Sequence, residues 1–86
     1  MHTVDLLEHA AQVAKQLGYR LREEWLGGSG GGPCEIKGQK WLFVDLALSP
    51  AEQLAQVAAA IRNEPSAAQL DLPYELRRAL QLRKIA

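Results

Sequence analysis

Apolar residues recur at helical spacing over the first segment of the chain. They lie three and four positions apart, at Val4, Leu7, Ala11 and Ala14. This spacing places them on one face of a helix that we predict from Thr3 to Leu17. Thr3 is its predicted N-cap, and Gly18 supplies the left-handed residue that commonly ends a helix.

The next segment, YRLREEWL over 19–26, alternates between apolar and charged residues, which is typical of a half-buried strand. Tyr19, Leu21 and Trp25 fall on one face, and the opposite face carries charged side chains. The alternation therefore predicts that the Trp25 ring packs in the core rather than serving as an exposed stacking platform.

Two further strands are predicted in CEIKG and KWLFVDLAL, with a turn at Gly38-Gln39 between them. The second one, over 40–48, is apolar on both faces. That pattern is typical of a strand in the middle of a sheet, or of one whose outer side is covered by a second subunit. Trp41 and Phe43 share one face, and we predict core packing for Trp41 as for Trp25.

The strongest local signal is a capping box at the start of the next helix. Ser49 is the predicted N-cap, Pro50 occupies the first helical position, and Glu52 is placed to bond back to the N-cap. An apolar face follows at Leu54, Val57, Ala58 and Ile61. Pro65 ends this helix near Asn63. A last helix is predicted to begin at Asp71-Leu72-Pro73 and to extend toward Ile85.

The predicted element order is α-β-β-β-α-α within one domain, 1–86. Strands joined by short connections usually pair antiparallel. We therefore expect an α+β fold in which helices pack on one face of a small three-stranded antiparallel sheet. The apolar surplus of 40–48 then favours self-association as a homodimer, with Trp41 and Phe43 as the interface candidates.

The composition argues against several classes of function. Ten acidic and ten basic residues cancel, so the chain as a whole offers no electrostatic case for nucleic acid or an anionic membrane. One cysteine cannot form an internal disulfide, and with two histidines it cannot complete a structural zinc site. The N-terminus lacks a signal-peptide pattern, and no apolar run is long enough to cross a bilayer. We expect a cytoplasmic protein without metal or cofactor.

A glycine-rich segment, which we call the glycine loop, separates the first two strands. It consists of Gly27, Gly28, Ser29, Gly30, Gly31, Gly32 and Pro33. Phosphate-binding loops need a following helix whose N–H groups meet the anion, whereas this loop leads into a strand and lacks their glycine spacing. The loop is also longer than a hairpin requires. It is therefore a candidate binding loop that contacts a partner, and the alternative is a flexible connection without a binding role.

Three residues carry the catalytic alternatives. Cys34 needs a base to act as a nucleophile, and His9 on the first helix is the candidate; packing as a small buried hydrophobe is the structural alternative. Asp45 interrupts the most apolar strand. Its carboxylate is predicted to bond to loop amides or to pair with an arginine, with a general base as the functional alternative.

A basic patch is predicted on the last helix, from Arg77, Arg78, Arg83 and Lys84. Such residues can contact phosphate backbones, and near a helix C-terminus they also offset the helix dipole.

The stretch from Leu17 to Ile61 resembles a group of small bacterial proteins of unassigned function. The matching positions are Gly31, Gly32, Cys34, Gly38, Asp45 and Glu52. The resemblance implies a strand, a Gly-Gly-x-Cys loop, a hairpin and a capped helix, and it implies no activity. The hairpin-then-helix layout is also similar to the start of some zinc peptidases. Their HExxH motif is missing from EQLAQVAAAIRNE, which excludes zinc hydrolysis there.

The first hypothesis is a small non-enzymatic bacterial module for self-association or binding of a protein partner, through the face of the apolar strand or the glycine loop. The rival from another class is a cysteine-dependent enzyme that uses Cys34 with His9. Weak nucleic-acid binding by the basic last helix is the second alternative.

Overall fold

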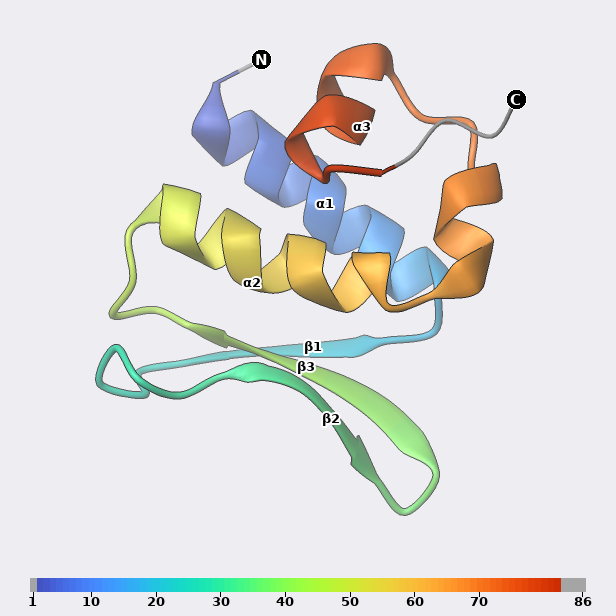
Figure 1. The fold of residues 1–86 in the computed structure, drawn as a ribbon. Helices are drawn as coiled ribbons and strands as arrows, with labels where there is room; N and C mark the ends of the chain where they lie inside the picture. The colour runs from blue at the N-terminus through green and yellow to red at the C-terminus, as the bar shows by residue number, and fades with distance from the viewer. Residues whose placement is uncertain (1, 83–86) are drawn as a thin grey trace.

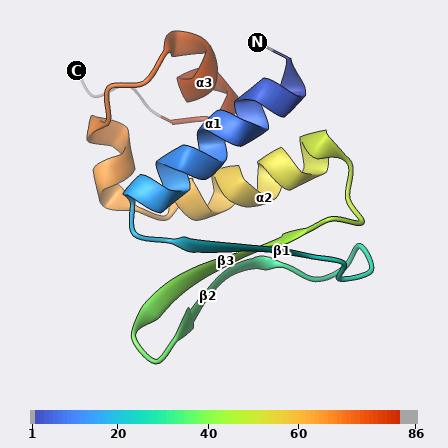
Figure 2. The same ribbon diagram turned by 180° about the vertical axis from the view of Figure 1, so that it is seen from behind.

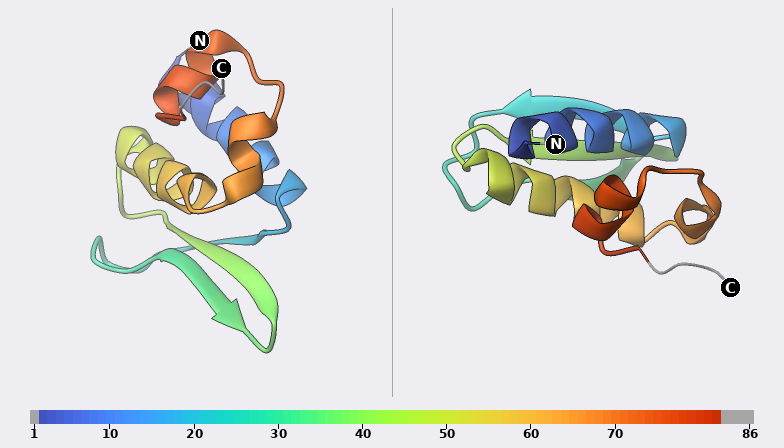
Figure 3. Two further views of the ribbon diagram at one scale, coloured as in Figure 1. Left: turned by 45° about the vertical axis from the view of Figure 1, so that its right-hand side comes forward. Right: turned by 90° about the horizontal axis from the view of Figure 1, so that it is seen from above.

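Two helices lie side by side over one face of a three-stranded sheet (Figures 1 and 3). This arrangement is seen in a computed structural model, which describes residues 2–82. The helices over the sheet are α1 (Thr3–Gln16) and α2 (Pro50–Arg62). The strands are β1 (Arg20–Glu24), β2 (Gly32–Ile36) and β3 (Gln39–Asp45). A 3-10 helix, η1 (Pro65–Gln69), and a short helix, α3 (Tyr74–Ala79), complete the described chain.

The hydrophobic core lies between the sheet and the two long helices. The strands contribute Leu42 and Val44 to it, both almost fully buried. On the far side of the helices, α3 adds a third layer (Figure 1), and Leu76 on this helix and Leu80 at its C-cap are both buried in the core. The remaining buried apolar residues are Ala10, Val13, Ala14, Tyr19, Val57, Ala58, Ala60, Ile61 and Ala67.

The predicted helix boundaries are confirmed where local chemistry sets them. Ser49 Oγ accepts a hydrogen bond from the backbone N–H of Glu52 at 3.3 Å, and the Glu52 carboxylate accepts one from the Ser49 N–H at 3.1 Å. α2 ends at Arg62, just before Pro65, and Gly18 ends α1 with a φ of +98°. The N-cap of α1 is His2 rather than Thr3, because the Asp5 carboxylate accepts from the His2 N–H.

The sheet is mixed, so the predicted all-antiparallel pairing is wrong. The strand order is β1-β3-β2, with β1 parallel to β3 and β2 antiparallel to it. After β1 the chain crosses to the far side of β3, where it forms β2. Only the β2–β3 hairpin therefore follows the rule that strands joined by a short connection pair antiparallel. Of the two alternatives for the apolar strand, a place in the middle of the sheet is confirmed, because β3 pairs on both sides.

A tight hairpin joins β2 to β3. Lys37 and Gly38 both have positive φ, +51° and +77°, which is the backbone of a type I′ turn. Ile36 and Gln39 close this two-residue turn as a pair. The hairpin extends past the helical layer and curls away from it (Figure 3).

Two further expectations need correction. Trp25 follows the end of β1 and is 76% exposed, so it is not part of the core. The last helix begins at Tyr74 instead of Asp71 and covers one and a half turns, because the 71–73 segment stays extended up to its N-cap, Pro73. Ile85, toward which this helix was predicted to extend, lies outside the described residues. No helix within 2–82 is long and apolar enough to cross a membrane.

Removal of the α2 N-cap should weaken the fold. Ser49→Ala deletes the acceptor for the Glu52 N–H, a loss that typically costs about 1 kcal/mol. In a domain of this size that lowers Tm by roughly 4–8 °C. Thermal unfolding followed by circular dichroism measures the shift. Ser66→Ala, an exposed serine in η1, is the matched control, and equal Tm values for the two variants would contradict the role of the cap.

Candidate functional site

The face of the sheet opposite the helices carries a strip of aromatic and charged side chains. On β3 the rings of Trp41 and Phe43 stack with centroids 6.1 Å apart and planes 19° apart. The Arg20 guanidinium lies 5.8 Å from the centre of the Trp41 ring, and Arg22 pairs with Glu24 at 2.6 Å. We call this surface the open face. Its side chains come from Arg20, Arg22, Glu24, Cys34, Ile36, Trp41 and Phe43.

No element within residues 2–82 covers the open face (Figures 1 and 2). Trp41 and Phe43 are half-buried by their own neighbours, and Ile36 is 43% exposed. The prediction of core packing for Trp41 is therefore wrong: the ring lies on the side of β3 that faces away from Leu42 and Val44. The open face thus combines exposed apolar surface with charged side chains along one edge.

The glycine loop is attached to the end of β3 by the carboxylate of Asp45. Asp45 is fully buried, and its two oxygens accept hydrogen bonds from the backbone N–H groups of Leu26 at 2.9 Å and Gly28 at 2.7 Å. A third bond comes from the Ala47 N–H at 2.9 Å. Of the alternatives for this residue, the structure shows the bonds to loop amides. These donors are all backbone groups, so the carboxylate holds together the backbone segments that surround it.

Gln56 on α2 holds the other half of the loop, a role that the sequence analysis missed. Its side-chain oxygen accepts from the Asp45 N–H at 3.0 Å, and its Nε2 donates to the Gly30 carbonyl at 2.9 Å. The Asp45 N–H points toward β2, and Gln56 takes the place of the strand there. The sequence offered only a glutamine next to the apolar position Val57 on the predicted helix. Many surface glutamines have such a neighbour, so this pattern does not identify the role.

Burial raises the pKa of the Asp45 carboxyl, but hydrogen bonds from the Leu26, Ala47, Gly28 and Gly30 backbones outweigh it, so the pKa lies below its ordinary value. A general base that works near neutral pH needs a pKa shifted the other way. The Glu52 carboxyl also has a lowered pKa, because the Ser49 hydroxyl and N–H donate to it.

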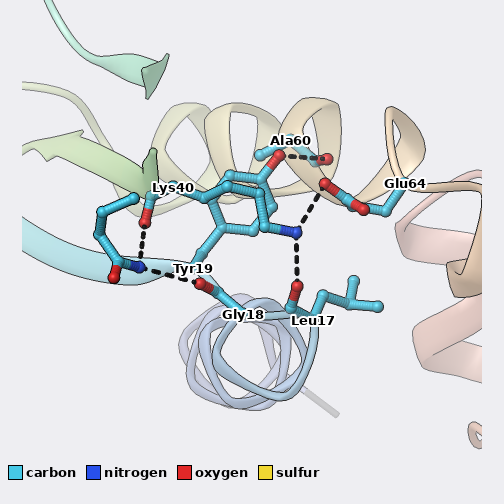
Figure 4. Close-up of polar contacts among 7 residues, drawn as sticks. Leu17, Gly18, Tyr19, Lys40, Ala60 and Glu64 are labelled. Carbon is cyan, nitrogen blue, oxygen red and sulfur yellow. Dashed lines mark hydrogen bonds and ion pairs between the residues drawn. The ribbon is translucent and has the colours of Figure 1, made fainter. Parts of the chain in front are cut away.

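A second polar cluster joins the end of α1 to the sheet and to α2 (Figure 4). The Lys40 ammonium donates to the Leu17 carbonyl at 2.6 Å, pairs with Glu64 at 2.9 Å, and lies 4.9 Å from the centre of the Tyr19 ring. The Tyr19 hydroxyl points to the Ala60 carbonyl at 3.4 Å. Burial, and then the charge of Glu64, raise the pKa of Tyr19. Every member thus has a partner, and the cluster fastens the C-terminus of α1.

The structure does not bring Cys34 and His9 together. Cys34 is exposed on β2, which corrects its reading as a buried hydrophobe, and its thiol contacts the Glu35 carbonyl at 4.0 Å. It borders a shallow hollow of about 250 Å³ next to Lys40 and Glu64. His9 lines a different hollow, between α1 and the start of α3. No described contact links the two, and no base is placed beside the thiol within 2–82.

The predicted basic patch is divided. Arg77 donates to the backbone carbonyls of Ala68 and Leu70 and so anchors η1 to α3. Arg78 is exposed on α3. Arg83 and Lys84 lie outside the described residues. Among the residues that are described, no group of three His, Cys, Asp or Glu side chains is arranged to hold a metal ion.

Comparison with protein-family models, with curated proteins and with solved structures gives no match for this chain.

The tight approach at Gly31 provides a test of the loop geometry. A Cβ at this position would come within 2.6 Å of Gln56 Nε2 and 2.9 Å of the Phe43 carbonyl, whereas at Gly32 it would meet nothing within 4 Å. Both residues have positive φ, so both alanine variants carry the backbone strain. Gly31→Ala should therefore lower Tm further than Gly32→Ala, by roughly 5 °C or more. Equal Tm values for the two variants would show that the loop does not pack as described.

The buried carboxylate should make stability depend on acid pH. Because its pKa is lower in the folded chain than in the unfolded one, its contribution is present above about pH 4 and is lost as pH falls through the folded value. Asp45→Asn replaces an acceptor-only group with one that also donates, facing N–H donors. We expect a Tm at least about 5 °C lower at neutral pH.

The same variant should show a shallower loss of stability between about pH 5 and pH 2 than the wild type. Urea unfolding at a series of pH values measures it. Asp71→Asn, an exposed aspartate before α3, is the matched control and should keep the wild-type profile. An unchanged profile for Asp45→Asn would contradict the assignment.

Proposed function

We propose that this chain is a non-enzymatic interaction module whose open face binds a second copy of itself. The observation that carries the proposal is the stacked Trp41–Phe43 pair on the central strand, on the side that the helices leave free. A strand that is apolar on both faces is normally covered on both, and here only one side is. A second sheet packed face to face would cover the other.

The open face is smaller than the surface that stable protein complexes bury. With strands about 4.8 Å apart and a rise of about 3.3 Å per residue, the sheet covers roughly 300 Å² in projection. Stable complexes bury about 800 Å² per partner. The last residues of the glycine loop, Gly32 and Pro33, are the first residues of β2 and are already part of this area. We therefore expect a weak dimer with Kd of about 10–500 µM.

The charges along β1 favour a particular orientation. Arg20 lies at one end of the open face and Glu24 at the other. A two-fold axis that crosses the strands reverses their direction, so Arg20 of one protomer approaches the partner's Glu24, and the reverse contact forms by symmetry. The same axis places Arg22, which pairs with Glu24 of its own chain, opposite the partner's Arg22, so the complementarity lies in the two Arg20–Glu24 contacts. These contacts support a second copy as the occupant over a partner of one charge.

Phe43→Thr tests the proposal with little risk to the fold, because the side chain is half-exposed and threonine suits a strand. Sedimentation velocity from about 5 µM to about 1 mM should show self-association of the wild type and a Kd weakened at least about tenfold in the variant. Tyr74→Thr removes an aromatic side chain that is 77% exposed on α3, and serves as the matched control. A wild type that stays monomeric to the highest concentration overturns the proposal.

The single thiol provides a second readout. Cys34 pairs with Trp41 in the β2–β3 register and therefore faces the proposed partner. Its alkylation by iodoacetamide should slow as protein concentration rises through the Kd, and should not slow in Phe43→Thr. Self-association with an alkylation rate that is independent of concentration would place the contact elsewhere on the chain.

A further inference from the structure

The edge of β1 is open, and its free hydrogen-bonding groups are identified by the register. The Leu46 N–H donates to the Glu24 carbonyl, so Glu24 directs its backbone groups at β3. Residues alternate in a strand, so Arg20 and Arg22 do the same, while the N–H and C=O groups of Leu21 and Glu23 point away from the sheet. No other strand within 2–82 pairs with them.

The opposite edge of the sheet is less able to accept a strand. In the β2–β3 hairpin the pair Ile36 and Gln39 closes the turn, so Pro33 and Glu35 are the β2 residues that face outward. Proline has no N–H, and a proline at an edge is a common barrier to strand addition. The two edges therefore differ, with only β1 offering an uninterrupted set of donors and acceptors.

An apolar hollow of about 270 Å³ adjoins the open β1 edge. It lies where α1 diverges from β1 toward its own N-terminus (Figure 2). Its floor contains Val44 and Val57, which are 3% and 0% exposed, and its outer wall contains Val4, which is 52% exposed. The hollow thus connects the hydrophobic core with the surface beside the strand edge. Leu7, Ala11, Leu21 and Gln53 complete the apolar and neutral lining.

The charged residues at this hollow are both acidic. Glu8 projects from α1 and Glu23 from β1, both exposed, and no basic side chain lines the hollow. Glu23 is opposite Val44 in the register, on the helix side of the sheet, so the carboxylate and the hollow lie on the same side of the strand edge. On an added strand, a basic residue on the same face as an apolar residue would lie next to these carboxylates while the apolar side chain enters the hollow.

We propose that the β1 edge and this hollow form a docking groove for an extended polypeptide segment of a partner protein. The segment would add as a fourth strand beside Leu21 and Glu23. On the helix side it would present an aliphatic side chain to the hollow and a Lys or Arg to Glu8 and Glu23. Main-chain bonds supply affinity in this mode, and the alternate side chains supply specificity. The groove is separate from the open face, so the proposal stands independently of self-association.

Two hexapeptides test the proposal, acetyl-TLTKTV-amide and its counterpart acetyl-TLTETV-amide. In both, Leu and Val share a face with the charged residue, and Thr occupies the other face. Hydrogen exchange of the isotope-labelled protein, followed by NMR at millimolar peptide, should show at least about tenfold slower exchange for the Leu21 and Glu23 amides with the Lys peptide. The Arg22 amide, which already faces β3, should not change.

Charge reversal provides the matched variant. Glu23→Lys alters an exposed side chain and should reverse the preference, so that the Glu peptide binds at least about fivefold more tightly than the Lys peptide. The proposal is overturned if the Leu21 and Glu23 amides are already protected from exchange in the free protein. It is also overturned if neither peptide changes their exchange rates. Peptide-induced shifts confined to Trp41 and Phe43 also overturn it, since they would place the peptide on the open face. Equal affinity for the two peptides overturns the assigned charge.

Discussion

The fold depends on one buried carboxylate. Asp45 ends the central strand and accepts hydrogen bonds from Leu26 and Gly28, which follow β1 in the chain. These bonds hold the end of β1 beside the end of β3, and that is the geometry of a parallel pair. The chain must then turn back past β3 before it forms β2. The glycine loop makes this turn, and Gly27, Gly28 and Gly31 adopt positive φ values within it, a backbone conformation that glycine takes without strain.

The mixed sheet decides which surfaces stay free. Because β3 is central, it presents two apolar faces, and α1 and α2 cover only the one that carries Leu42 and Val44. Trp41 and Phe43 are left on the other. The parallel placement of β1 also puts the strand at the edge under α1, where the helix rises away and leaves the hollow lined by Val44 and Val57. An antiparallel meander of the same three strands would place β2 at the centre and would offer different edges.

The helices could be predicted because their signals are local. Ser49, Pro50 and Glu52 specify the start of α2 within four residues, and Gly18 specifies the end of α1. Strand parity was also local, so the two faces of β3 were assigned correctly. Strand direction is not determined locally, because the bonds from Leu26 and Gly28 to Asp45 span 19 and 17 residues. Periodicity contains no information about such a contact, and the short-connection rule then favoured the wrong pairing.

The glycine loop was interpreted as a binding loop for the same reason, because its contacts with Asp45 and Gln56 cannot be seen in the sequence pattern. Its composition resembles that of loops that bind ligands, whereas its Gly28 N–H donates inward to Asp45 and its Gly30 carbonyl accepts from Gln56. These two groups are occupied by the protein itself and are not available to a ligand. At the β1 edge, in contrast, the backbone groups of Leu21 and Glu23 point away from the sheet, and no strand within 2–82 pairs with them. Backbone groups there must find water or another strand, and the adjoining apolar hollow favours a strand, because burial of one aliphatic side chain adds to the main-chain bonds.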